Sequence, residues 1–168
     1  LPGLVPHVHA TTNATESASI LVAVGAAGEE EYGKIFRQTA DRWRQVSEQA
    51  GARWQEIGLG DTNGPSDLDR LQRLLADEPR QSSAELWLVL IGHGTFDGRE
   101  ARFNLRGPDL SASALAGWLK PFQRPVVVLN GASSSGPFIK ALSGPGRVIV
   151  TATRSGVVSV PACFCTVR

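Results

Sequence analysis

The sequence predicts an α/β domain in which a mainly parallel sheet lies between two layers of helices. Short strand-like segments alternate with helix-like patterns, and such alternation joins parallel strands through right-handed crossovers. The expected strands are Ile20–Val24, Arg53–Ile57, Leu86–Ile91, Val126–Leu129 and Val148–Ala152. Four of these have an unbroken apolar character, which is typical of strands that are covered on both faces. The predicted architecture is therefore a three-layer α/β/α sandwich.

Length and charge indicate a single domain and argue against nucleic-acid-binding and membrane proteins. The chain has 168 residues, which suits a single domain with a sizeable core. Its 17 Lys and Arg residues nearly balance 16 Asp and Glu residues, and the Arg residues are scattered. We therefore expect neither a nucleic-acid partner nor an anionic membrane surface. No apolar run is long enough to predict a membrane span.

The two ends of the chain differ in character from the middle. Residues 1–18 are rich in Pro, Thr, Ser and Ala, and they predict a flexible lead-in that could hold the remnant of a secretory signal. A trimmed chain end explains that stretch equally well. Asn13 begins a glycosylation sequon, and the two features together favour an exported location. We expect the domain over 19–160 and an atypical, truncated tail over 161–168.

No cofactor and no metal site are predicted. Cys163 and Cys165 are separated by one residue, which is poor geometry for a disulfide and supplies too few ligands for a metal. The turn from Gly25 to Gly28 could cradle a phosphate, since small residues link a strand to a helix there. It lacks the third glycine of the dinucleotide fingerprint and the Lys-Ser/Thr of a P-loop.

Helices and a hairpin are expected between the strands. A long amphipathic helix should run roughly from Glu29 to Ala50, with glutamates at its positive end. Alternation in Arg99–Leu110 predicts a half-exposed hairpin arm. The remaining expected helices are one capped by Ser66 or Asp67 and running to about Leu75, one over Ala114–Leu119 capped by Ser111 or Ser113, and a brief one over Phe138–Leu142.

His93 is the first candidate functional residue. It follows the apolar strand Leu86–Ile91, and Gly92, Gly94 and Gly98 predict an open loop around it. Open α/β sheets bind ligands at the carboxyl ends of their strands. A histidine buried in the core is the alternative interpretation. The flanking glycines favour function, because they would admit a substrate and leave the Gly94 amide free to donate.

The second candidate is the loop Asn130–Gly136, which follows the strand Val126–Leu129. Its hydroxyls, on Ser133, Ser134 and Ser135, should lie at the same edge of the sheet as His93. A base and several hydroxyls would then share one crevice. The alternative is a Ser/Gly turn that caps the next helix. Spacing alone does not decide between these interpretations.

Taken together, the motifs resemble the legumain-type peptidases, relatives of the caspases and gingipains. The matching segments, in the family's order, are Val24–Tyr32, Ile91–Gly98, Asn130–Gly136 and Val148–Thr153 with the following Arg154-Ser-Gly. The resemblance implies a caspase-like three-layer fold, a catalytic base at His93 and an oxyanion amide at Gly94. It places the nucleophile at Ser133, and further binding positions at Gly131, Ser134, Ser135 and Arg154.

Two departures from the family bear on activity. The family's nucleophile is a Cys, whose thiol ionises readily, whereas the hydroxyl of Ser133 needs a base bonded directly to it. The family also carries an acidic residue where this chain has Gly131, and its Arg-His pair is unmatched around Lys34.

We therefore predict a weakly active or inactive peptidase homologue that acts as a binding or regulatory module for a peptide or protein ligand. One alternative is an active hydrolase that uses Ser133 with His93. Another is a flavodoxin-like, non-enzymatic binding domain in which His93 is structural.

Overall fold

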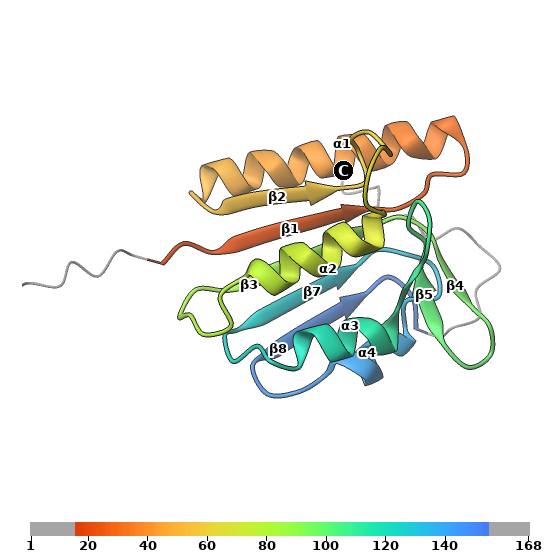
Figure 1. Cartoon of the computed structure of the whole chain (residues 1–168). Coiled ribbons are helices and arrows are strands. Elements are labelled where there is room, and N and C mark those ends of the chain that lie inside the picture. Colours follow the sequence, from red (N-terminus) through yellow and green to blue (C-terminus); the bar gives the residue numbers. More distant parts are fainter. Residues whose placement is uncertain (1–15, 155–168) are drawn as a thin grey trace, which may run out of the picture.

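A five-stranded parallel sheet forms the centre of the molecule in the computed structural model, which describes residues 16–154 (Figure 1). Its strands are β1 (Ser19–Val24), β2 (Arg53–Ile57), β3 (Leu86–Ile91), β7 (Val126–Asn130) and β8 (Arg147–Thr151). They lie in the order β2-β1-β3-β7-β8, and every neighbouring pair is parallel. The predicted α/β fold with a mainly parallel sheet is confirmed.

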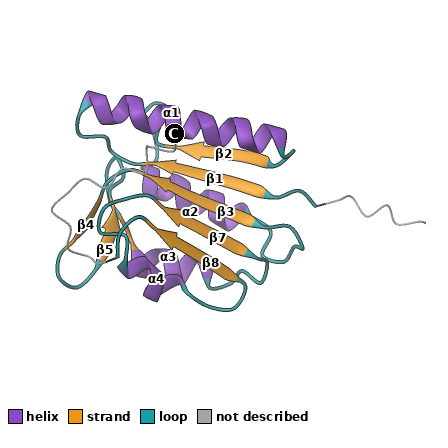
Figure 2. Ribbon diagram, turned by 180° about the vertical axis from the view of Figure 1, so that it is seen from behind, coloured by secondary structure: helices purple, strands orange, loops and turns teal. Residues whose placement is uncertain are grey.

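Helices lie on both faces of this sheet, which makes three layers (Figure 2). They are α1 (Glu30–Gln49), α2 (Asp67–Asp77), α3 (Ala112–Leu119) and α4 (Pro137–Leu142). Successive side chains of a strand point to opposite faces. Accordingly Leu88 and Leu90 pack with residues of α2, α3 and α4, whereas Val89 and Ile91 pack with residues of α1.

The central position of β3 follows from its composition. It lies between β1 and β7, and each of its side chains meets a helix layer or a neighbouring strand. Leu86, Leu88 and Leu90 are almost completely buried on one face. A strand of alternating polarity would place polar groups in one of these two cores, so the unbroken apolar run requires this interior position.

Two predicted helix caps are confirmed, and one capping interpretation is wrong. Ser66 Oγ accepts from Asp69 N and Ser111 Oγ accepts from Ala114 N, each at 3.1 Å. The cap of α4 is Gly136, without a side-chain hydrogen bond. The serines of the loop before α4 therefore do not cap that helix. α1 starts one residue later than expected and ends one residue earlier, and α2 extends two residues further.

A small antiparallel sheet stands beside the carboxyl edge of the main sheet. It consists of β4 (Gly94–Phe96), β5 (Ala101–Phe103) and β6 (Leu110–Ser111). The expected open loop after His93 is thus wrong, because Gly94 pairs with Phe103 in this sheet. Phe103 lies nine residues after Gly94 in the chain. A strand of three residues is too short to show the alternating pattern by which a strand is predicted from sequence.

Several predictions concern residues outside the described range. They are the signal remnant, the sequon at Asn13, the cysteine pair and the tail over 161–168. Of the expected lead-in, residues 16–18 are described, and Glu16 accepts from Ser82 Oγ at 2.6 Å and from Ser83 N at 2.9 Å. Within residues 16–154, no helix has both the length and the apolar character needed to cross a bilayer.

Candidate functional site

Two loops meet at the carboxyl edge of the sheet, because β3 and β7 are adjacent and parallel. Ser133, in the loop after β7, donates its hydroxyl proton to the carbonyl oxygen of Gly94 at 3.0 Å. The same hydroxyl accepts from the Gly94 amide at 3.3 Å. The structure therefore brings Ser133 and Gly94 together. Both contacts use main-chain groups of the loop after β3.

The Gly94 amide is engaged, which corrects the expectation that it is free. A Cβ on Gly94 would lie 2.3 Å from Ser133 O and 3.0 Å from Arg102 O. Glycine at this position thus permits the close approach of another part of the same chain. A Cβ on Gly92 would likewise lie 3.0 Å from the Phe103 ring and 3.1 Å from the Cα of Gly25. Packing between loops accounts for both glycines.

His93 is half-buried and turns toward α1. Its Nε2 lies 3.1 Å from the carbonyl oxygen of Ala27, to which it donates. The ring meets Tyr32 edge-on, with centroids 4.7 Å apart and planes at 84°, and meets Phe36 at 5.2 Å and 64°. These contacts hold the imidazole between the β1–α1 turn and the first turns of the helix. With Nε2 protonated, Nδ1 is the acceptor of the neutral ring.

The hydrogen bonds of His93 and Ser133 therefore run to different partners. Nε2 of His93 is bonded to Ala27, and the hydroxyl proton of Ser133 is bonded to Gly94. A serine nucleophile is activated by a base that accepts its proton. In this geometry that proton is directed at a carbonyl oxygen instead.

The next two serines of the loop are buried. Ser135 is fully buried, and its Oγ lies 3.2 Å from Thr153 Oγ1 and accepts from Thr153 N at 3.3 Å. Ser135 thus links the loop to the chain that follows β8. Ser134 has a φ of 55°, in the left-handed region that favours glycine. The backbone of a non-glycine residue is strained in this region, and such strained residues concentrate at functional sites.

The last two predicted site residues, Gly131 and Arg154, lie in different surroundings. The amide of Gly131 donates to Leu90 O at 3.0 Å, so it extends the pairing of β7 with β3. A Cβ at this position would lie 3.4 Å from the same oxygen, which is ordinary contact, so a methyl group would fit. Arg154 is exposed and is the last described residue.

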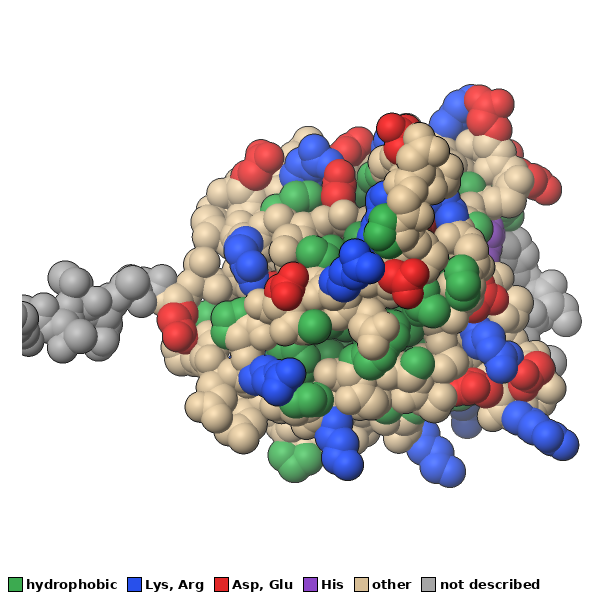
Figure 3. All heavy atoms as spheres, viewed as in Figure 1, with side chains coloured by type: hydrophobic (Ala, Val, Ile, Leu, Met, Phe, Trp, Pro, Cys, Tyr) green, Lys and Arg blue, Asp and Glu red, His purple; other side chains and the backbone are tan. Residues whose placement is uncertain are grey.

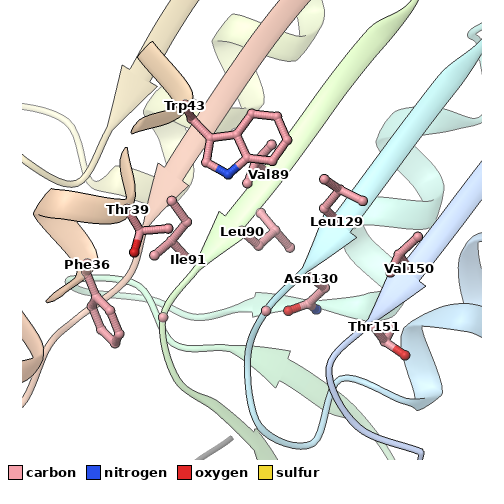
Figure 4. Close-up of a pocket in the computed structure, with 12 residues that line it drawn as sticks. Phe36, Thr39, Trp43, Val89, Leu90, Ile91, Leu129, Asn130, Val150 and Thr151 are labelled. Carbon is pink, nitrogen blue, oxygen red and sulfur yellow. The ribbon is translucent and has the colours of Figure 1, made fainter. Parts of the chain in front are cut away.

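A pocket that the sequence does not reveal lies between α1 and the sheet (Figure 4). Its volume is about 250 Å³, and most of its lining is apolar. The lining residues are Phe36, Thr39, Trp43, Val89, Leu90, Ile91, Gly92, Leu129, Asn130, Gly131, Val150 and Thr151. An asparagine that ends an apolar strand is the one sequence signal that points here.

Asn130 ends β7 and bonds to the serine loop. The side chain is 2% exposed, and its Oδ1 accepts from the amide of Ala132 at 3.1 Å. Its Nδ2 is buried and has no hydrogen-bond partner among the described residues. Asn130 is the register partner of Leu90, so its side chain lies on the face of the sheet that carries α2, α3 and α4, away from this pocket.

No protein-family model matches the chain, and no curated protein matches it. The likeness to legumain-type peptidases therefore rests on the motifs alone.

Charged side chains of both signs lie on the surface. Figure 3 shows acidic and basic side chains interspersed over the face in view. Arg102 and the amides of Glu100 and Arg99 hold the pKa of the Asp97 carboxyl well below its usual range. Within residues 16–154, no cluster of three or more His, Cys, Asp or Glu side chains could hold a metal ion.

Proposed function

We propose that this chain is a legumain-type peptidase-fold domain in which serine stands at the nucleophile position. It acts as a binding or regulatory module for a peptide or protein ligand, with weak or no hydrolysis. The adjacency of the His93 and Ser133 loops at the carboxyl edge supports this proposal. Open α/β sheets bind their ligands at such edges.

The destination of the Ser133 proton is the observation that carries the proposal. That proton is bonded to the Gly94 carbonyl, and Nε2 of His93 is bonded to Ala27. A thiol at position 133 would lose its proton readily without a bonded base, whereas a hydroxyl does not. A serine in this loop is therefore a poor nucleophile.

Peptide turnover and ligand binding together test the proposal. Native protein, Ser133→Ala and Ser133→Cys are compared with a peptide library, each with Cys163 and Cys165 replaced by Ser. We expect turnover by the native and Ala forms to equal the background, and iodoacetamide to label residue 133 only in the Cys form. Library peptides should shift the amide signals of Gly94 and Gly131 in the native protein.

Two results would refute it. Strong native turnover that Ser133→Ala abolishes would establish the active serine hydrolase instead. Absence of peptide-induced shifts at Gly94 and Gly131 would reject the binding module. Failure of hydrolysis in both the Ser and Cys forms would leave binding intact and point to the missing acidic side chain at Gly131.

The packing of His93 favours one further candidate, a non-enzymatic domain with a structural histidine. Edge-on contacts with Tyr32 and Phe36 are stabilising aromatic interactions. In that case His93→Gln should lower stability while peptide binding at Gly94 and Gly131 is absent. Chemical denaturation combined with the same NMR titration separates the two candidates.

A further inference from the structure

Asn63 and Asn130 are each followed by glycine in the sequence. In such a pair the main-chain nitrogen of the glycine can attack the side-chain amide of the asparagine, because a residue without a Cβ hinders the approach least. The attack releases ammonia and leaves a cyclic imide, which water then opens. The same dipeptide thus occurs at two places, and its surroundings decide where it reacts.

The pair Asn130–Gly131 is held in an unreactive arrangement. Asn130 is 2% exposed, and its Oδ1 accepts from the amide of Ala132 at 3.1 Å. The nitrogen of Gly131 donates to Leu90 O at 3.0 Å, so the atom that would attack is fixed in the pairing of β7 with β3. We therefore expect this asparagine to stay intact in the folded protein.

The pair Asn63–Gly64 lies in the loop between β2 and α2, and both residues are exposed. Within residues 16–154, no hydrogen bond holds the side chain of Asn63 or the amide of Gly64. The φ of Gly64 is 100°, in the left-handed region, so this loop conformation favours the glycine that the reaction needs. The attacking nitrogen and the amide that it attacks are both open to solvent.

Arg70, in the first turn of α2, contacts the peptide group that reacts. Its Nη2 donates to the main-chain carbonyl oxygen of Asn63 at 3.0 Å. That oxygen belongs to the peptide bond whose nitrogen is the nitrogen of Gly64. When this nitrogen loses its proton, the negative charge is shared with the oxygen, and a cationic donor bonded there stabilises it. Arg70 therefore favours the anion that attacks Cγ of Asn63.

We propose that Asn63 is a modification site at which Arg70 promotes deamidation to isoaspartate. The nitrogen of Gly64 loses its proton and bonds to Cγ of Asn63, while the bond from Cγ to the side-chain nitrogen breaks and ammonia leaves with the proton. Water then opens the imide at the carbonyl that Arg70 polarises. The net reaction consumes water, releases ammonia and needs no other reactant.

The product changes both the charge and the main chain of this loop. The new carboxylate contains the oxygen that Arg70 now contacts, and the main chain continues through Cγ. The loop follows β2 at the carboxyl edge of the sheet, and Arg106 ties it to the small antiparallel sheet by donating to Gly60 O at 2.8 Å. Deamidation thus adds a negative charge at the edge that carries the candidate site, although the inference is independent of the proposed function.

The test follows the full chain at neutral pH by peptide mapping with mass spectrometry, and isoaspartate methyltransferase labels the isoaspartate. We expect conversion at Asn63 alone in the folded protein, and at Asn63 and Asn130 alike in guanidinium chloride. Arg70→Gln should slow the reaction about fivefold, less than the roughly hundredfold cost of removing an enclosed oxyanion donor, because the loop is exposed. Arg70→Lys, which keeps a charged donor, should restore part of the rate. Arg73→Gln removes an exposed charge from the same helix and should change the rate less than about twofold.

Equal conversion at Asn63 and Asn130 in the folded protein would overturn the proposal. So would an Asn63 that stays intact while the unfolded chain reacts, or aspartate as the main product. Equal slowing by Arg70→Gln and Arg73→Gln would assign the effect to net charge and would reject the role of the hydrogen bond. Circular dichroism checks the fold of each variant, and Arg70→Met, which keeps the apolar stem, gives the same comparison if Arg70→Gln unfolds.

Discussion

Contacts at single residues determine how the two loops of the candidate site fit together. The carbonyl oxygen of Ser133 occupies the space that a Cβ on Gly94 would need, and the Ser133 hydroxyl bonds to both main-chain groups of Gly94. Gly94 is therefore required for packing, whatever ligand the edge binds. Mutations at this site consequently test stability and function together, and the two need separate measurements.

Gly94→Ala should destabilise the protein by about 2 kcal/mol, because the added methyl overlaps main-chain atoms that cannot move independently. Urea denaturation followed by circular dichroism gives the free energy of unfolding. Gly60→Ala is the matched control, because a Cβ there meets nothing within 4 Å, and its effect should stay within about 0.5 kcal/mol. Equal stability of the two variants would contradict the packing role of Gly94.

At the scale of elements, side chains stabilise turns and helix ends by hydrogen bonds to main-chain amides. The periodicity of the sequence does not predict where these turns and ends lie. The β4–β5 turn is held by Asp97, which accepts from the amides of Arg99 and Glu100 at 2.9 Å each and pairs with Arg102 at 2.6 Å. The start of α2 is held by Ser66. Both devices are local in sequence, because each joins residues no more than five positions apart.

The β4–β5 hairpin should loosen in acid. Arg102 lowers the pKa of Asp97, and hydrogen bonds from Ser113 lower the pKa of Glu100. Because these pKa values are lower in the folded chain, the stabilisation is complete above about pH 4.5 and is lost progressively as the pH falls further. Hydrogen exchange of the β4 and β5 amides between pH 7 and pH 2.5 measures it. The same acid response in Asp97→Asn would exclude Asp97 as its source.

Ser66→Ala should destabilise α2 by about 1 kcal/mol, because the amide of Asp69 loses its acceptor. Thermal unfolding gives the change in stability. Ser83→Ala serves as the control, since Ser83 is exposed and its hydroxyl contact with Glu16 is long, at 3.4 Å. A loss in the control as large as that in Ser66→Ala would contradict a specific capping effect.

At the scale of the whole molecule, an ionic cluster joins the carboxyl end of α2 to the amino ends of β2 and β7. Glu78 follows α2, Arg53 begins β2 and Arg124 precedes β7, and Glu78 pairs with both arginines. Glu78 and Arg124 are each 3% exposed. Arg124 also donates to the carbonyl oxygens of Ala84 at 2.8 Å and Glu85 at 2.9 Å. The cluster thus ties the start of β2, the segment after α2 and the segment before β7 together, at the edge of the sheet opposite the candidate site.

Glu78→Gln should destabilise the protein by about 3 kcal/mol or more, since it leaves the buried guanidinium of Arg124 without its carboxylate. Denaturant unfolding measures the change. Glu30→Gln is the control, because the Glu30–Lys34 pair is exposed and such pairs contribute about 0.5 kcal/mol or less. A small effect at Glu78 would show that the main-chain acceptors of Arg124 suffice.

Local patterns in the sequence were enough to predict the five strands, their parallel arrangement, the caps of α2 and α3 and the edge at which His93 and Ser133 lie. The reason is that apolar runs and capping residues act over a few neighbouring positions. Only the folded chain decided that Gly94 begins a strand, that the Ser133 proton bonds to Gly94 and that His93 turns to Ala27. It also decided the pocket beside α1 and the unpaired Nδ2 of Asn130. These features depend on contacts between residues as far apart as 66 positions, whose geometry periodicity does not encode.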